Sequence, residues 1–240
     1  MWKPKVEAYG QAVGILLLDA YVPYIPGDVG NAKTFRYTVI YRTVEGLTGS
    51  ECINNPGAWT EKVVAKAIEL EEQGVRGISS NAGAMIAFQD AVSAAVKVPV
   101  CLSPFTQLPW IAAAFDKSKA IGVITGDSRT INKDKLKQYG IKLDHPIVVA
   151  GLEKQPAFKS AVHQQKGKLD SDKIEKEVVR AAKAMVKKNP KVAAILMASG
   201  PLCAYTKAVQ DAVGLPIFDT VSMIDFMTSA TLQDPPKGYY

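Results

Sequence analysis

The fold is decided by two stretches of sequence, GISSNAGAMIAFQDAVSAAVKVPV at residues 77–100 and AILMASGPLCAYTKAVQDAVGLPI at residues 194–217. They align without a gap at an offset of 117, and eight of the 24 aligned positions are identical. The composition alone would give about one or two identities by chance. The identical pairs are Ile78/Ile195, Gly83/Gly200, Ala87/Ala204, Ala91/Ala208, Val92/Val209, Ala95/Ala212, Val96/Val213 and Pro99/Pro216. The chain therefore contains an internal repeat.

The likeness extends beyond this core. Residues 62–72 (KVVAKAIELEE) resemble residues 177–187 (EVVRAAKAMVK), and residues 12–19 (AVGILLLD) resemble residues 120–127 (AIGVITGD). Two unrelated strand–helix units could look alike because both are buried. Shared order across four consecutive elements favours duplication of one ancestral half.

Each half is predicted to run strand, helix, strand, helix, strand. The expected elements, paired between the halves, are strands 12–18 and 120–125, helices 60–73 and 174–188, strands 75–80 and 192–198, and strands 99–103 and 216–220. Strands that alternate with helices form parallel sheets. We therefore predict an α/β fold of two pseudo-twofold-related halves with a ligand cleft between them. We expect residues 1–115 plus 219–240 to form the first half and residues 116–218 the second.

Composition excludes several classes of protein. The chain has 240 residues, of which 48% are hydrophobic and 22% charged, as in ordinary globular proteins. Its longest apolar run, residues 12–18, is too short to span a bilayer, and we see no apolar secretory signal near the N-terminus. We therefore expect a cytoplasmic protein with no membrane partner. The net charge of +6 arises mainly from lysines that alternate with Asp, Glu and Gln between residues 117 and 191, so we expect no nucleic-acid partner.

Cysteine and histidine are scarce. Cys52, Cys101 and Cys203 are too few and too scattered for a disulfide framework or a zinc site. His145 and His163 are the only histidines, so a histidine-rich metal site is excluded. We expect no metal and no cofactor.

The repeat also indicates where a ligand would bind. In parallel α/β sheets, ligands bind beyond the carboxyl ends of the strands, against the N-termini of helices. The duplicated strand ends contain Ser80, Asn81 and Gly83 in the first half and Ser199 and Gly200 in the second. Either segment alone could simply cap a helix. Two such segments related by a repeat favour a site for a small carboxylate.

Five segments of the chain resemble the aspartate/glutamate racemase superfamily, with its hydantoin-racemase-like branch as the nearest kin. The segments are GILLLDAYVPYIPGDVGNAKTF (14–35), YRTVEG (41–46), EEQGVRGISSNAGAMIAFQ (71–89), GVITGDS (122–128) and AAILMASGPLCAYTKAVQDAVGLPIFDTV (193–221). The resemblance covers nearly the whole chain. It implies two pseudosymmetric α/β halves with the substrate between them, and an assembly of more than one copy.

Racemases of this superfamily use two cysteines, one that removes a proton from the substrate and one that returns it. The resemblance places those positions at Ala82 and Ser199, so both cysteines are absent here. An alanine transfers no proton, and a serine is a poor base without an activating partner. Neither histidine lies near these motifs in the sequence. The chain should therefore not racemise by the two-cysteine mechanism.

The superfamily also includes decarboxylases, isomerases and lyases. We therefore expect an enzyme that binds a small carboxylate in the cleft and acts near its α-carbon by lyase, decarboxylase or isomerase chemistry. Two alternatives stay open: a non-catalytic carboxylate-binding protein, and an amino-acid racemase inactivated by replacement of its cysteines with alanine and serine.

Several residues at strand ends are candidates for these roles. The catalytic candidates are Ser199, Asp219, Cys203 and Cys101. The substrate-binding candidates are Asp19, Asn31, Ser80, Asn81, Ala82, Gly83, Thr125, Ser128, Ser199 and Gly200. Thr125 and Ser128 resemble superfamily positions that help to hold a carboxylate. The alternatives are burial as a small apolar side chain for Cys203, capping for Asp19, and a rigid turn at PGDVGN for Asn31.

Overall fold

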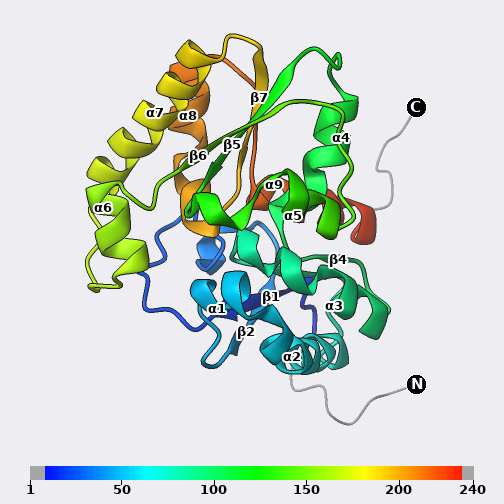
Figure 1. The fold of residues 1–240 in the computed structure, drawn as a ribbon. Coiled ribbons are helices and arrows are strands. Elements are labelled where there is room, and N and C mark those ends of the chain that lie inside the picture. The colour runs from blue at the N-terminus through cyan, green and yellow to red at the C-terminus, as the bar shows by residue number, and fades with distance from the viewer. Residues whose placement is uncertain (1–8, 234–240) are drawn as a thin grey trace, which may run out of the picture.

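The computed structural model of this chain describes residues 9–233 and contains two four-stranded parallel sheets (Figure 1). The strand order is β2-β1-β3-β4 in the first sheet and β6-β5-β7-β8 in the second, so the two sheets have the same topology. The strands are β1 Val13–Leu18, β2 Val39–Val44, β3 Ile78–Ser80, β4 Val100–Cys101, β5 Ala120–Thr125, β6 Ile147–Gly151, β7 Val192–Met197 and β8 Ile217–Phe218. The predicted α/β fold with two related halves is confirmed.

Each sheet contains one strand that was not predicted from the sequence. β2 pairs with β1, and β6 pairs with β5, at the outer edge of each sheet. Five of the six residues of β2 are only half-buried, and its sequence VIYRTV includes polar side chains. Such edge strands lack the continuous apolar run by which the central strands are recognised.

The long helices agree with the prediction to within a few residues. α2, Thr60–Glu72, and α7, Ser171–Lys188, follow the edge strands of their halves and pack on equivalent faces of the two sheets. The other helices are α1 Gly49–Asn54, α3 Gln89–Ala95, α4 Leu108–Ala113, α5 Lys133–Gln138, α6 Pro156–Phe158, α8 Thr206–Val213 and α9 Thr220–Thr231. Short 3-10 helices, Gly83–Phe88 and Gly200–Tyr205, start directly after the duplicated strand ends.

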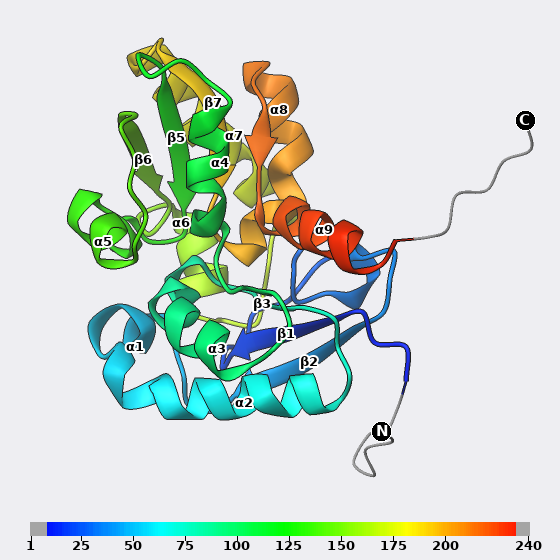
Figure 2. The ribbon, with the colours of Figure 1, turned by 90° about the vertical axis from the view of Figure 1, so that its right-hand side faces the viewer.

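Two helices cross between the sheets: α4, which precedes β5, packs on the second sheet, and α9, which follows β8, packs on the first (Figure 2). Leu108 and Ile111 of α4 belong to one apolar cluster with Val123 of the second sheet. Met223 and Ile224 of α9 belong to another cluster, with strand β1 of the first sheet. This exchange joins the halves through buried apolar surface, which stabilises their relative position. The residue boundaries that we predicted for the halves stay a prediction.

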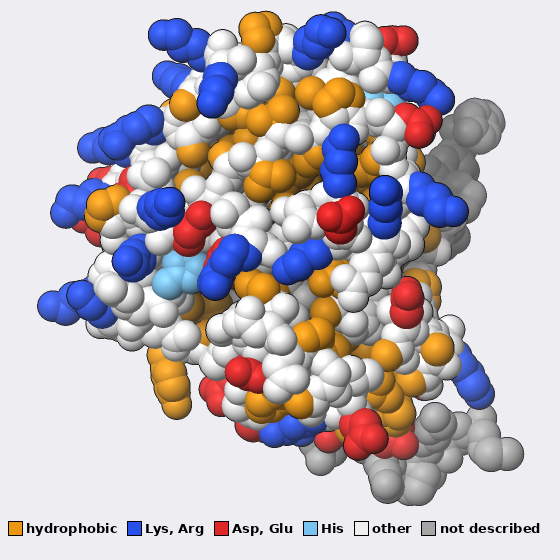
Figure 3. Space-filling view, in the orientation of Figure 1, with side chains coloured by type: hydrophobic (Ala, Val, Ile, Leu, Met, Phe, Trp, Pro, Cys, Tyr) orange, Lys and Arg blue, Asp and Glu red, His pale blue; other side chains and the backbone are white. Residues whose placement is uncertain are grey.

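Two features of the structure relate to the expectations of no nucleic-acid partner and no membrane partner. On the face shown in Figure 3, Lys and Arg side chains are spread out and interspersed with Asp and Glu. Within residues 9–233, every helix is too short or too polar to cross a membrane.

Candidate functional site

The two duplicated strand ends meet at the centre of the molecule. Ala82 and Ser199 form an antiparallel bridge, and the backbone N–H of Gly200 donates to the carbonyl oxygen of Asn81 at 3.1 Å. Ala82 and Ser199 are both half-buried. The two positions at which the resemblance places the racemase cysteines thus lie side by side, one from each half.

This close approach requires glycine in both halves. A Cβ atom on Gly83 would lie 2.4 Å from the carbonyl oxygen of Ala198, and one on Gly200 would lie 2.5 Å from the carbonyl oxygen of Asn81. Both obstructing atoms belong to the backbone of the opposite half, so neither can move away alone. The identity of Gly83 and Gly200 in the repeat therefore has a packing cause.

A cavity of about 320 Å³ lies at this junction. The carboxyl ends of β1, β3, β5 and β7 border it, as expected for a parallel α/β protein. Five of the predicted site residues line it: Asn81, Ala82, Gly83, Thr125 and Ser199.

The two halves line the cavity with different chemistry. The first half contributes apolar and uncharged side chains, namely Leu18, Ala20, Val22, Tyr24, Thr48, Ser50, Ile53, Asn81, Ala82 and Ala84. The charged lining residues of the described chain, Asp127 and Arg129, and the histidine, His163, all come from the second half. Asp127 is the counterpart of Asp19 in the repeat, so the sequence indicated it as a candidate as well, whereas Arg129 and His163 were not predicted as site residues.

Arg129 is held by Asp127. Its Nη2 lies 2.6 Å from Oδ2 of Asp127, and its Nε donates to both carboxylate oxygens, with Oδ1 at 3.0 Å. These hydrogen bonds, and then the charge of Arg129, lower the pKa of Asp127, although partial burial opposes them. The Arg129 side chain is 66% exposed, whereas that of Asp127 is only 10% exposed. Within residues 9–233, Nη1 of Arg129 has no hydrogen-bond partner, which leaves one edge of the guanidinium for an anion.

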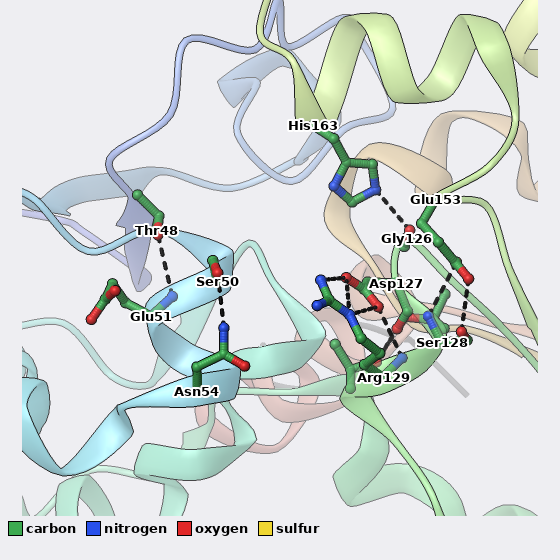
Figure 4. A network of polar contacts seen from close by, with 12 residues as sticks. Thr48, Ser50, Glu51, Asn54, Gly126, Asp127, Ser128, Arg129, Glu153 and His163 are labelled. Carbon is green, nitrogen blue, oxygen red and sulfur yellow. Dashed lines mark hydrogen bonds and ion pairs between the residues drawn. The ribbon is translucent and has the colours of Figure 1, made fainter.

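His163 lies on the same side of the cavity (Figure 4). It ends the π-helical turn Lys159–His163 that continues α6. Its Nε2 lies 2.9 Å from the carbonyl oxygen of Gly126, and its ring packs edge-on against Phe158, with 5.7 Å between the centroids. His163 is distant from the site motifs in the sequence, because the segments after β5 and β6 come together only in the fold.

On the other side, Tyr24 and Asn81 are linked. Asn81 Nδ2 donates to the Tyr24 hydroxyl at 3.2 Å, while Asn81 Oδ1 accepts from the backbone N–H of Leu18 at 3.1 Å. Burial, assisted by the charge of Asp28, raises the pKa of Tyr24 to about 12. The phenol is therefore protonated at neutral pH.

A hydrogen bond beside the cavity links the two halves. The backbone N–H of Tyr21, in the first half, donates to Oε1 of Gln165, a cavity-lining residue of the second half, at 2.8 Å. Gln165 is the one non-glycine residue with positive φ, 48°, in the described part of the chain. The residue that makes this contact between the halves therefore has a strained backbone conformation.

Three catalytic candidates lie outside the cavity wall. Asp219 is buried and caps α9, where its Oδ1 accepts from the N–H of Ser222 at 2.7 Å and its Oδ2 accepts from the Thr206 hydroxyl at 2.6 Å. Cys203 is buried, and Cys101 lies on β4. Burial raises the pKa of both thiols. Both cysteines pack in the apolar cluster around α9, so neither supplies a thiolate to the cavity.

The remaining predicted binding residues have local structural contacts instead of lining the cavity. Asp19 accepts from the N–H of Gly46, Asn31 donates to the carbonyl of Tyr24, Ser80 donates to the carbonyl of Leu102, Ser128 donates to Glu153, and Gly200 abuts Asn81. The sequence places these residues at strand ends and loops, but it does not reveal the direction of their side chains. These contacts agree with the capping and turn alternatives for Asp19 and Asn31, and their binding roles stay predictions.

Several dimethylsulfoniopropionate lyases match almost the whole chain in sequence. A dimethylsulfoniopropionate lyase from Durusdinium sp. clade D is 29% identical over 236 residues, which are 95% of this chain and 77% of the lyase. Dimethylsulfoniopropionate lyase 3 from Emiliania huxleyi is 29% identical over 237 residues, again 95% of this chain. The chain spans about three fifths (61%) of the length of that second lyase. No protein-family model matches the chain.

Solved structures with the same fold include a decarboxylase and a racemase. Arylmalonate decarboxylase superposes with a TM-score of 0.60 at 14% identity, covering 92% of both chains. Glutamate racemase RacE1 from Bacillus anthracis superposes with a TM-score of 0.61 at 13% identity, covering 92% of this chain and 80% of the racemase. The resemblance found in the sequence is confirmed. The expectation of lyase or decarboxylase chemistry agrees with these relatives.

Proposed function

We propose that this chain, which has the fold of the aspartate/glutamate racemase superfamily, is a lyase that binds a small carboxylate between its halves and breaks a bond next to the α-carbon. The observation that carries the proposal is the pair Ala82 and Ser199, which lie together at the cavity in place of two proton-transferring thiols. The dimethylsulfoniopropionate lyases matched over 95% of the chain support the reaction class.

Racemisation and elimination differ in the number of acid–base groups that they need. Racemisation by proton transfer needs one group on each face of the substrate, so that a proton leaves on one side and returns on the other. An elimination needs one base and an anchor for the substrate. With titratable groups concentrated on the second-half side, the cavity suits elimination better than racemisation.

Arg129 supplies the anchor. The free edge of its guanidinium binds the carboxylate of the substrate, and Asp127 holds the side chain in position from the opposite edge. Removing one partner from a charge-assisted pair of this kind costs about 2 kcal/mol.

For a sulfonium propionate the atoms balance as follows. A base takes the proton from the carbon beside the carboxylate, and the C–H electron pair becomes the second bond of a C=C double bond. The carbon–sulfur bond breaks, and its electron pair leaves with the sulfur as dimethyl sulfide. The other product is acrylate. The reaction needs no electron donor or acceptor, and we propose that no cofactor takes part.

The test is incubation of the purified chain with dimethylsulfoniopropionate, with acrylate followed by proton NMR and dimethyl sulfide by headspace gas chromatography. Phenylmalonate and both enantiomers of aspartate and glutamate complete the panel. We expect product from the sulfonium substrate, or carbon dioxide from the malonate, and no change in optical rotation of the amino acids.

Two outcomes would overturn the proposal. Racemisation of an amino acid would contradict the reaction class. Thermal stabilisation by these carboxylates without any product would identify a non-catalytic carboxylate-binding protein instead.

A further inference from the structure

We infer that His163 is the general base of this site and removes the α-proton in place of the thiols that are absent from positions 82 and 199. The inference rests on the proposed function, because it names the group that would carry out its proton transfer.

The other polar groups of the cavity are poorly suited to this step. Asp127 is held ionised by Arg129, and its two oxygens already accept hydrogen bonds from that side chain. The Tyr24 phenol holds its proton at neutral pH. The Ser199 hydroxyl has no basic side chain bonded to it within residues 9–233 that could activate it.

The contacts of His163 leave one ring nitrogen free to act. Nε2 faces the carbonyl oxygen of Gly126, which only accepts hydrogen bonds, so Nε2 carries the proton in the neutral ring. Nδ1 is then the unprotonated nitrogen. Figure 4 shows this nitrogen directed away from Gly126, on the side of the ring toward α1 and Ser50. Ser50 also lines the cavity, so Nδ1 faces the space in which a ligand would lie.

The surroundings also hold the ring of His163 in place. Phe158 packs edge-on against the ring, and Asp127 lies close enough for the charge of His163 to contribute to the lowered pKa of that carboxyl group. The other charged groups on this side are already engaged: Arg129 is paired with Asp127, and Glu153 accepts from the hydroxyl of Ser128.

The proposed step is a single proton transfer. Nδ1 takes the α-proton while the carbon–sulfur bond breaks and dimethyl sulfide departs. The imidazolium then returns its proton to water after acrylate leaves.

His163→Gln tests this assignment. A glutamine amide can still donate to Gly126 but cannot serve as a base. We expect kcat to fall by a factor of about 100 to 10,000, with KM changed less than about threefold. The matched control is His145→Gln, because His145 bonds the carbonyl of Phe115 and does not line the cavity. It should leave kcat unchanged.

A second measurement does not depend on turnover. With only two histidines in the chain, nitrogen-15 NMR of histidine-labelled protein resolves both rings, and His145→Gln assigns them. We expect the Nε2–H tautomer at His163, and a shift of its Nδ1 resonance when propionate is added.

The outcomes separate the inference from the proposed function. Wild-type activity that survives in His163→Gln would overturn the inference and leave the lyase proposal standing. An Nδ1–H tautomer, or an Nδ1 resonance that propionate does not move, would overturn it even if the wild-type protein released no product. Absence of product with the expected NMR behaviour would count against the lyase proposal alone.

Discussion

The two halves of this molecule share a backbone and differ in what they offer a ligand. In the first half, Asn81, Ala82 and Gly83 follow β3, and the surrounding wall is apolar or uncharged. In the second half, the matching residues Ala198, Ser199 and Gly200 follow β7, and the wall carries Asp127, Arg129 and His163. Duplication thus preserved the packing frame while the chemistry became one-sided. That asymmetry is why we favour a reaction that needs proton transfer on one face only.

The strongest test of the shared frame is to add a methyl group at either glycine. Gly83→Ala and Gly200→Ala should each lower the free energy of unfolding by about 3 kcal/mol, because the new Cβ meets a backbone oxygen of the other half. Denaturation by urea measures the loss. Gly57→Ala is the control, since a Cβ there meets nothing within 4 Å. A tolerated substitution at either site glycine would mean that the halves do not meet as described.

The halves also contrast in how they treat an aspartate. Asp28, in the first half, is buried, and burial raises its pKa to about 7 despite a hydrogen bond from Gly30. Its folded-state pKa lies above the unfolded value, so its contribution to stability is present below about pH 4 and is lost as the pH rises toward 7. Asp28→Asn should raise the free energy of unfolding by about 2 kcal/mol at pH 8 and remove this pH dependence.

Asp127, in the second half, should behave in the opposite sense. Its pKa is lowered by Arg129, so its contribution is present at neutral pH and is lost as the pH falls through the folded-state pKa. Asp127→Asn should therefore destabilise the protein at pH 8 and not in strong acid. Urea denaturation at several pH values measures both effects. If Asp28→Asn and Asp127→Asn changed the free energy of unfolding in the same direction at pH 8, the contrast between the two aspartates would be wrong.

The difference between the two cavity walls predicts a difference in substrate binding. Arg129→Gln should raise KM for dimethylsulfoniopropionate about 30-fold, the equivalent of ~2 kcal/mol, because the carboxylate loses its charged partner. Ser50→Ala, on the uncharged first-half wall, should change KM less than about threefold. Initial-rate kinetics measure both. Equal changes in KM for Arg129→Gln and Ser50→Ala would show that the second half does not dominate substrate binding.

The smallest effect on stability is expected at the contact between Gln165 and Tyr21. Gln165→Gly removes the strain of a left-handed backbone conformation, which should raise the free energy of unfolding by about 1 kcal/mol. The same change removes the hydrogen bond to Tyr21, which should lower the free energy of unfolding by a similar amount. Overall stability should therefore change by less than about 0.5 kcal/mol. Hydrogen exchange of the Tyr21 amide should nevertheless become faster, and unchanged exchange would argue against this contact.

The sequence predicted the frame of the fold better than the site. The repeat gave the two sheets, the helices on them and the paired positions Ala82 and Ser199, because buried strands and duplicated glycines leave a local signature. The edge strands β2 and β6 were not predicted, because strands of half-buried residues leave only a weak hydrophobic pattern in the sequence.

The site escaped prediction where it depends on long-range contacts and side-chain direction. Asp219 directly follows strand β8, close to the predicted strand end, but its carboxylate caps α9. His163 reaches the cavity through a loop and a π-helical turn, and no sequence periodicity indicates that route. The short spacing from Asp127 to Arg129 after strand β5 was a local signal that could have indicated the ion pair that we propose as the substrate anchor.

The most direct measurement of the central claim is dimethyl sulfide release before and after alkylation of the protein with iodoacetamide. None of the three cysteines lines the cavity, so we predict equal initial rates from the treated and untreated protein. Mass spectrometry shows which thiols have reacted, and circular dichroism confirms that the treated protein is folded. Release that is absent from the untreated protein, or that disappears when a thiol of the folded protein is alkylated, would contradict a lyase that works without cysteine.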